Sequence, residues 1–64
     1  MKELTLAEIT AVSMYRPGSE ATVAEVTAKR DAFWEMYQTV RYGQVRATFE
    51  NAIERLNDWL AEAA

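Results

Sequence analysis

The sequence predicts an all-α fold, in which a short N-terminal helix is followed by a helical hairpin and two copies form a dimeric helical bundle. Two apolar stripes with steps of three and four residues indicate helices that each bury one face. The stripe in the last third of the chain comprises Val45, Phe49, Ala52, Leu56, Trp59 and Ala63, with Ile53 and Leu60 beside it. The middle stripe comprises Val23, Val26, Phe33, Tyr37 and Val40, with Arg30 as the member between Val26 and Phe33.

The first helix is expected over residues 5–15. Thr5 and Glu8 have the spacing of a capping box, in which the hydroxyl accepts from the Glu8 amide and the carboxylate accepts from the Thr5 amide. The helix should end by Tyr15, because the next residue, Arg16, precedes a proline and is disfavoured in helical conformation. Its apolar side is expected to contain Leu6, Ile9 and Val12.

A second helix is expected over residues 20–42. Pro17 and Gly18 suit the two central positions of a type II turn, and Ser19 would then cap the helix. The β-branched residues near its start, Val23, Val26 and Thr27, weaken the first two turns, so an extended segment there is an alternative.

Gly43 marks the expected junction with a third helix over residues 44–63. The middle stripe does not continue in phase past Val40: the next apolar stripe restarts one position late, at Val45. One residue corresponds to about 100° of rotation, so a straight helix would present two divergent faces. Gly43 as a C-terminal cap would resolve this conflict with a hairpin; a single long helix with a local bulge is the alternative.

The size of the chain predicts association with another molecule. A domain of 64 residues buries only about 60% of the surface that its unfolded chain exposes, and such domains usually need a disulfide, a metal or a partner. The sequence contains neither cysteine nor histidine, which excludes disulfides and the usual zinc ligands. We therefore expect a homodimer or docking on another protein.

Composition also argues against several classes of function. The net charge of −3 disfavours a nucleic-acid-binding protein. No run is long enough to cross a bilayer, the first five residues do not resemble a secretory signal, and the absence of cysteine fits a cytoplasmic protein. Without histidine or cysteine no nucleophile has a recognisable base, so we expect no enzyme, no catalytic residue and no cofactor. Glu50, Glu54 and Asp58 recur every four residues, but one helix offers ligands from one side only, and we interpret them as a solvated face without a metal.

Six residues are candidates for contact with a protein partner. Arg30 interrupts its stripe, so either its guanidinium reaches the edge of the core or it pairs with an acidic residue across an interface. Trp34 and Met36 flank the same stripe on opposite sides. Trp34 would pack on the first helix and Met36 on a dimer mate, or the two would form a patch for a foreign protein. Around the expected break, the aromatic side chain of Tyr42 stands between Arg41 and Arg46, a composition typical of interaction hot spots, although a solvated loop tip is the simpler interpretation. Arg41 would be favourable at a helix C-terminus and Arg46 unfavourable in the next helix's first turn.

Residues 1–13 resemble the leader of double-glycine bacteriocin precursors, which pair a Glu-Leu-Thr start with Glu-Ile and Val-Ser. This resemblance would imply an exported and processed peptide. Those leaders end in a glycine pair, whereas Met14 and Tyr15 stand at that place here, and the similar residues cover about a fifth of the chain.

Together these observations predict a non-catalytic adaptor or inhibitor that occludes a larger target protein, a role found among phage and mobile-element effectors. One alternative is a structural subunit or assembly chaperone whose self-association is its activity. The other is an acidic regulator of a nucleic-acid-processing complex.

Overall fold

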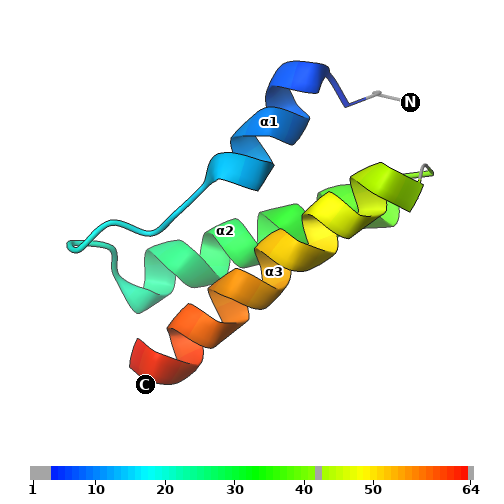
Figure 1. The fold of residues 1–64 in the computed structure, drawn as a ribbon. Helices are drawn as coiled ribbons and strands as arrows, with labels where there is room; N and C mark the ends of the chain where they lie inside the picture. The colour runs from blue at the N-terminus through cyan, green and yellow to red at the C-terminus, as the bar shows by residue number, and fades with distance from the viewer. Residues whose placement is uncertain (1–3, 42, 64) are drawn as a thin grey trace.

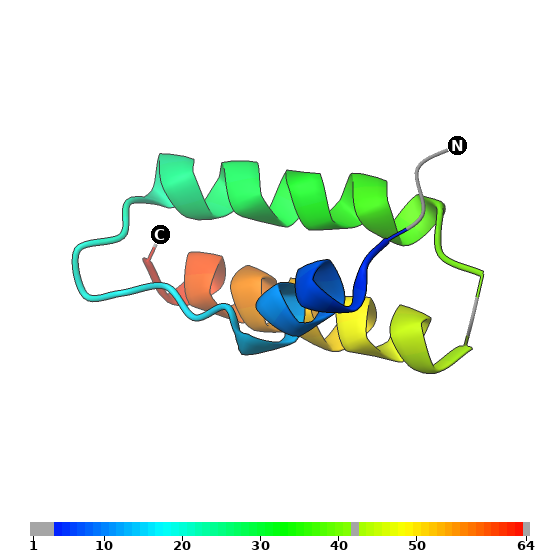
Figure 2. The same ribbon diagram turned by 90° about the horizontal axis from the view of Figure 1, so that it is seen from above.

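Three helices make up the described part of the computed structural model, which covers residues 4–41 and 43–63: α1 (Leu6–Met14), α2 (Val23–Gln38) and α3 (Gly43–Ala63). The helices α2 and α3 lie side by side and antiparallel, and α1 lies across one face of this pair (Figure 1). Seen from above, the segment between α1 and α2 runs back along the hairpin to reach the start of α2 (Figure 2). The described residues extend over 34 × 18 × 17 Å, and the long axis follows the hairpin.

The predicted hairpin is confirmed, but the chain reverses earlier than expected. Helix α2 ends at Gln38 instead of residue 42, because Thr39 takes the C-cap position and its hydroxyl donates to the carbonyl oxygen of Met36 at 2.8 Å. Gly43 is therefore the first residue of α3 and not the C-cap of α2. The phase shift between the two stripes correctly located the break, whereas the assumption that glycine must form the cap was wrong.

The start of α2 also differs from the prediction. The amide of Ala21 donates to the carbonyl oxygen of Gly18 at 3.1 Å, and this turn delays the helix to Val23. Thr22 is the N-cap, and its hydroxyl accepts from the Glu25 amide at 3.1 Å, so Ser19 does not have the predicted role. Gly18 does not have a positive φ, as the third position of a type II turn would require, so that turn prediction was also wrong.

Helix α1 begins with the predicted capping box. The Thr5 hydroxyl accepts from the Glu8 amide at 3.1 Å, and a Glu8 carboxylate oxygen accepts from the Thr5 amide at 3.4 Å. Val12 is buried and Ile9 is partly buried, as expected, but Leu6 is 79% exposed. Helix α1 thus contacts the hairpin through a narrow side, and Leu6 in its first turn lies outside that contact.

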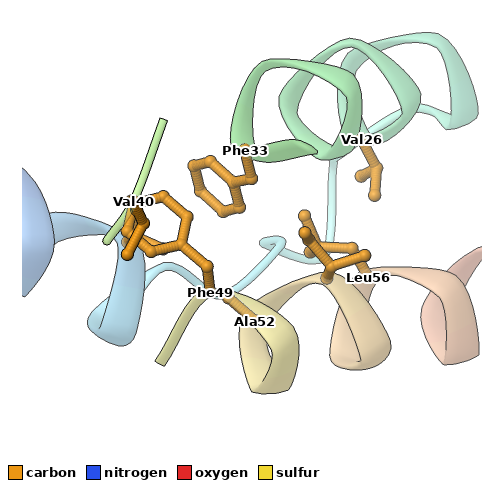
Figure 3. Packing of buried hydrophobic residues seen from close by; sticks show 8 residues of the cluster. Val26, Phe33, Val40, Phe49, Ala52 and Leu56 are labelled. Carbon is orange, nitrogen blue, oxygen red and sulfur yellow. The ribbon is translucent and has the colours of Figure 1, made fainter. Parts of the chain in front are cut away.

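The core joins all three segments through aromatic rings. Tyr15, just after α1, packs edge-on against Phe33 of α2 with ring centroids 5.8 Å apart, and Phe33 packs edge-on against Phe49 of α3 at 6.5 Å. Such perpendicular arrangements are favourable for aromatic pairs. Figure 3 shows Phe33 and Phe49 facing one another between the helices, with Leu56 opposite Val26 further along. The buried apolar side chains are Val12, Val26, Phe33, Val40, Phe49, Ala52, Ile53 and Leu56.

Most predicted core positions are confirmed. On α3, Phe49, Ile53 and Leu56 are buried, whereas the predicted members Val45, Trp59 and Leu60 pack partly buried against the core. On the middle stripe, Val26 and Phe33 are buried and Tyr37 is partly buried. Val40 is also buried, although it lies in the connection after α2 and not in the helix. The prediction for Val23 was wrong: it is 49% exposed because it is the first residue of α2, at the end of the hairpin.

Candidate protein-interaction surface

The hairpin has one covered face and one face that no described segment covers. On the covered side, the Lys29 ammonium of α2 lies over the Tyr15 ring, 5.3 Å from its centroid. Arg55 of α3 donates to the carbonyl oxygens of Ser13 and Tyr15 at the end of α1. On the opposite side lies a shallow hollow of about 290 Å³ that is open to solvent. We call this side the open face and define it by the residues that line the hollow: Arg30, Asp31, Trp34, Ile53 and Asn57.

Trp34 is the largest apolar side chain on the open face, and it is 51% exposed. Its indole stacks on the Tyr37 ring with centroids 5.5 Å apart and an interplanar angle of 25°. On α3, the Arg46 guanidinium lies over the same Tyr37 ring at 4.5 Å from the centroid. The stacking therefore holds the half-exposed indole against its own helix, which reduces the entropy that a partner would have to remove on binding.

Hydrogen bonds fix the neighbouring polar groups across the two helices. The Tyr37 hydroxyl donates to a Glu50 carboxylate oxygen at 2.6 Å and accepts from Arg46 Nη2 at 2.8 Å. Arg46 Nη1 also donates to the carbonyl oxygen of Val40 at 3.2 Å. Arg46 was expected to be unfavourable in the first turn of α3; its side chain instead reaches back and satisfies a carbonyl beyond the end of α2, where a cation is favourable.

Arg30 follows the first of its two predicted arrangements: its guanidinium reaches the edge of the core, and a pairing across an interface stays a prediction. Its Nη2 atom lies 3.2 Å from the Asp31 carboxylate on the same helix, and its Nη1 atom donates to Asn57 Oδ1 on α3 at 3.1 Å. The guanidinium thus sits at the edge of the core, at the rim of the hollow. The acidic partner within this chain is the neighbouring Asp31, and the contact that crosses to α3 is a neutral amide.

The six predicted contact residues do not gather in one place. Arg30 and Trp34 lie together on the open face, and Arg46 lies beside it through Tyr37. Met36 is partly buried against the core, and helical geometry places it on the flank of α2 that carries Lys29, away from Trp34. Arg41 is exposed in the connection after α2, and Tyr42 lies outside the described residues. The expectation that Trp34 packs on the first helix was wrong, since Trp34 lies on the other flank of α2.

The Tyr37 phenol has a raised pKa. The hydrogen bond to Glu50 is the main cause and burial adds to it, while the charge of Arg46 acts in the opposite direction. The neutral phenol is stabilised because its proton is the donor to the carboxylate, and ionisation would place two negative oxygens side by side.

This raised pKa predicts a loss of stability at alkaline pH. A folded-state pKa above the unfolded value of about 10 gives a stabilisation that is complete at lower pH and is lost as the pH rises through the folded-state pKa. We therefore expect the free energy of unfolding to fall more steeply above about pH 10 in the wild type than in Tyr37→Phe. Urea titrations at a series of pH values measure the free energy of unfolding of both proteins. The contributions of the other tyrosines are the same in both and cancel in the difference. Parallel curves for the two proteins would contradict the assignment.

Three residues that shape this surface or support α1 were not predicted from the sequence. Asn57 and Asp31 were not singled out, although Asn57 lies one turn from Ile53 and Asp31 is adjacent to Arg30. Arg55 was also missed; its spacing of three from Ala52 and four from Trp59 places it on the flank of the α3 stripe, and this spacing could have identified it.

Neither the described side chains nor known proteins identify a site of another kind. Among residues 4–41 and 43–63, no three acidic side chains lie close enough together to hold a metal ion. No helix in the same part of the chain is both long and apolar enough to cross a bilayer. Comparison with protein-family models, curated proteins and solved structures finds no match to this chain.

Proposed function

We propose that this chain is a non-catalytic protein-binding module, an adaptor or inhibitor that covers a site on a larger target protein through its open face. The observation that carries this proposal is the half-exposed Trp34, held by Tyr37 beside a solvent-open hollow. Tryptophan and arginine are enriched among the residues that dominate binding energy in protein interfaces. Such a module could act as an effector of a phage or mobile element, as expected from its size and composition.

The composition of the open face supports a protein partner over a small molecule. The hollow is shallow, whereas small-molecule sites usually enclose most of the ligand surface. Its apolar part, formed by Trp34 and Ile53, is bordered by the polar groups of Arg30, Asp31 and Asn57. An apolar centre with a polar rim is the usual organisation of a protein–protein interface.

Affinity purification from the native host tests this proposal, followed by binding measurements with the purified partner. We expect Trp34→Ala to weaken binding at least tenfold, which corresponds to about 1.4 kcal/mol. Leu6→Ala is the matched control, because it removes an exposed apolar side chain from α1, outside the open face. Equal affinity of the two variants, with wild-type helical circular dichroism in both, would show that the open face is not the binding surface.

Self-association as the activity is the second candidate, which would make the chain a structural subunit or assembly chaperone and retain the homodimer expected from its size. Arg30 and Asp31 place opposite charges side by side on the open face, so two copies related by a two-fold axis could pair Arg30 with Asp31 in both directions. Sedimentation equilibrium over a range of concentrations tests this, with Trp34→Glu expected to give monomers.

The third alternative, a regulator acting at a nucleic acid, has less support, since Arg46 is engaged with Tyr37 and Val40.

A further inference from the structure

Two arginine side chains converge on the C-terminal end of α1, on the side of the hairpin opposite the open face. Arg16 Nη1 donates to the carbonyl oxygens of Ser13 at 3.1 Å and Tyr15 at 2.9 Å. Arg55 Nη2, from the middle of α3, approaches the same two oxygens at 3.2 and 3.5 Å. The two guanidinium groups are therefore neighbours. A single arginine would be enough to donate a hydrogen bond to each of these carbonyls.

No carboxylate of the described residues forms an ion pair with either arginine. The chain as a whole is nevertheless acidic. Arg55 Nε is buried and has no hydrogen-bond partner. Burial lowers the pKa of Arg55, and the positive charge of Arg16 lowers it further.

We propose that Arg16 and Arg55 form a binding site for a phosphate group. Each guanidinium has N–H donors on three nitrogens, and each uses only one terminal nitrogen for the α1 carbonyls. Because Arg55 Nε is buried, the donors that remain for a ligand are the second terminal nitrogen of each arginine and Nε of Arg16. These donors suit the oxygens of a phosphate, which can accept charge-assisted hydrogen bonds from both arginines. Arg16 is exposed, so a phosphate can approach from solvent. The negative charge of the phosphate would relieve the repulsion between the two arginine cations.

The site is independent of the proposed protein-binding function, because it lies on the covered side of the hairpin and uses none of the residues of the open face. The bound phosphate can be the free ion or part of a phosphorylated molecule. Inorganic phosphate is the probe, because both ligands present the same group to the two arginines. The experiment is an NMR titration that follows the side-chain Nε–H resonances of Arg16 and Arg55 with phosphate, compared with chloride at equal ionic strength.

We expect saturable shifts of both resonances with phosphate, at a midpoint at least tenfold lower than with chloride. Arg16→Gln should raise the phosphate midpoint at least tenfold without disturbing the fold, since Arg16 is exposed. Arg55→Lys is a second variant, which keeps the positive charge but loses the planar guanidinium fork. Arg41→Gln, which removes an exposed cation at the other connection, should bind as the wild type does. Equal responses to phosphate and chloride, or wild-type phosphate binding by Arg16→Gln, would overturn the proposal.

Discussion

Truncating Phe49 to alanine should destabilise this protein more than any other single apolar truncation. Phe49 is fully buried and packs edge-on against Phe33, so its removal leaves a cavity between α2 and α3. Large-to-small substitutions of buried phenylalanine cost about 3–5 kcal/mol. Small domains have total stabilities near the lower end of about 5–15 kcal/mol, so the variant should be largely unfolded at moderate temperature.

Thermal and urea denaturation followed by circular dichroism measure this effect. Each kcal/mol should lower the melting temperature by roughly 4–8 °C in a domain of this size. Trp34→Ala is the control, because it removes a larger ring from a half-exposed position and should cost only about 1 kcal/mol. If the two variants lost similar stability, the packing between Phe33 and Phe49 would not be the centre of the core.

The second large effect is expected at Val12, which attaches α1 to the hairpin. Val12 is 3% exposed and is the one residue of α1 that is buried. Val12→Asp would place a carboxylate in an apolar contact without a partner, a change that costs several kcal/mol unless the helix moves away. We therefore expect α1 to detach while α2 and α3 remain paired through their own contacts, and the free energy of unfolding to fall by about 3 kcal/mol.

Hydrogen exchange resolves this outcome along the chain. The amides of α1 should lose protection in Val12→Asp, whereas those of α2 and α3 should keep most of theirs. Leu6→Asp is the matched control: Leu6 is 79% exposed, and an acidic residue in the first turn is favourable for the helix dipole. Wild-type protection of α1 in Val12→Asp would mean that other contacts, such as those of Arg55, suffice to hold α1.

The candidate site was predictable only in part. Trp34 and Arg30 were identified because each departs from the apolar stripe of α2, and the structure places both on the open face. Met36 was expected on the opposite side of the stripe from Trp34, and it lies there, partly buried against the core and away from the open face. The roles of Asn57 and Arg46 could not be predicted, because they depend on which residues of α2 lie opposite them.

The sequence by itself determined part of the local structure: three helices, the capping box at Thr5, the break between the two stripes and most of the core positions, but not the caps of α2 or the turn before it. These follow from the 3.6-residue period and from hydrogen bonds between residues close in the chain, which need no knowledge of the tertiary fold. The tertiary structure decided which side of the hairpin α1 covers, that Val40 is buried from a connection, and that Arg16 and Arg55 meet at one helix end. Such contacts depend on the rotation and offset of packed helices, and the spacing of residues within one helix contains no information about either.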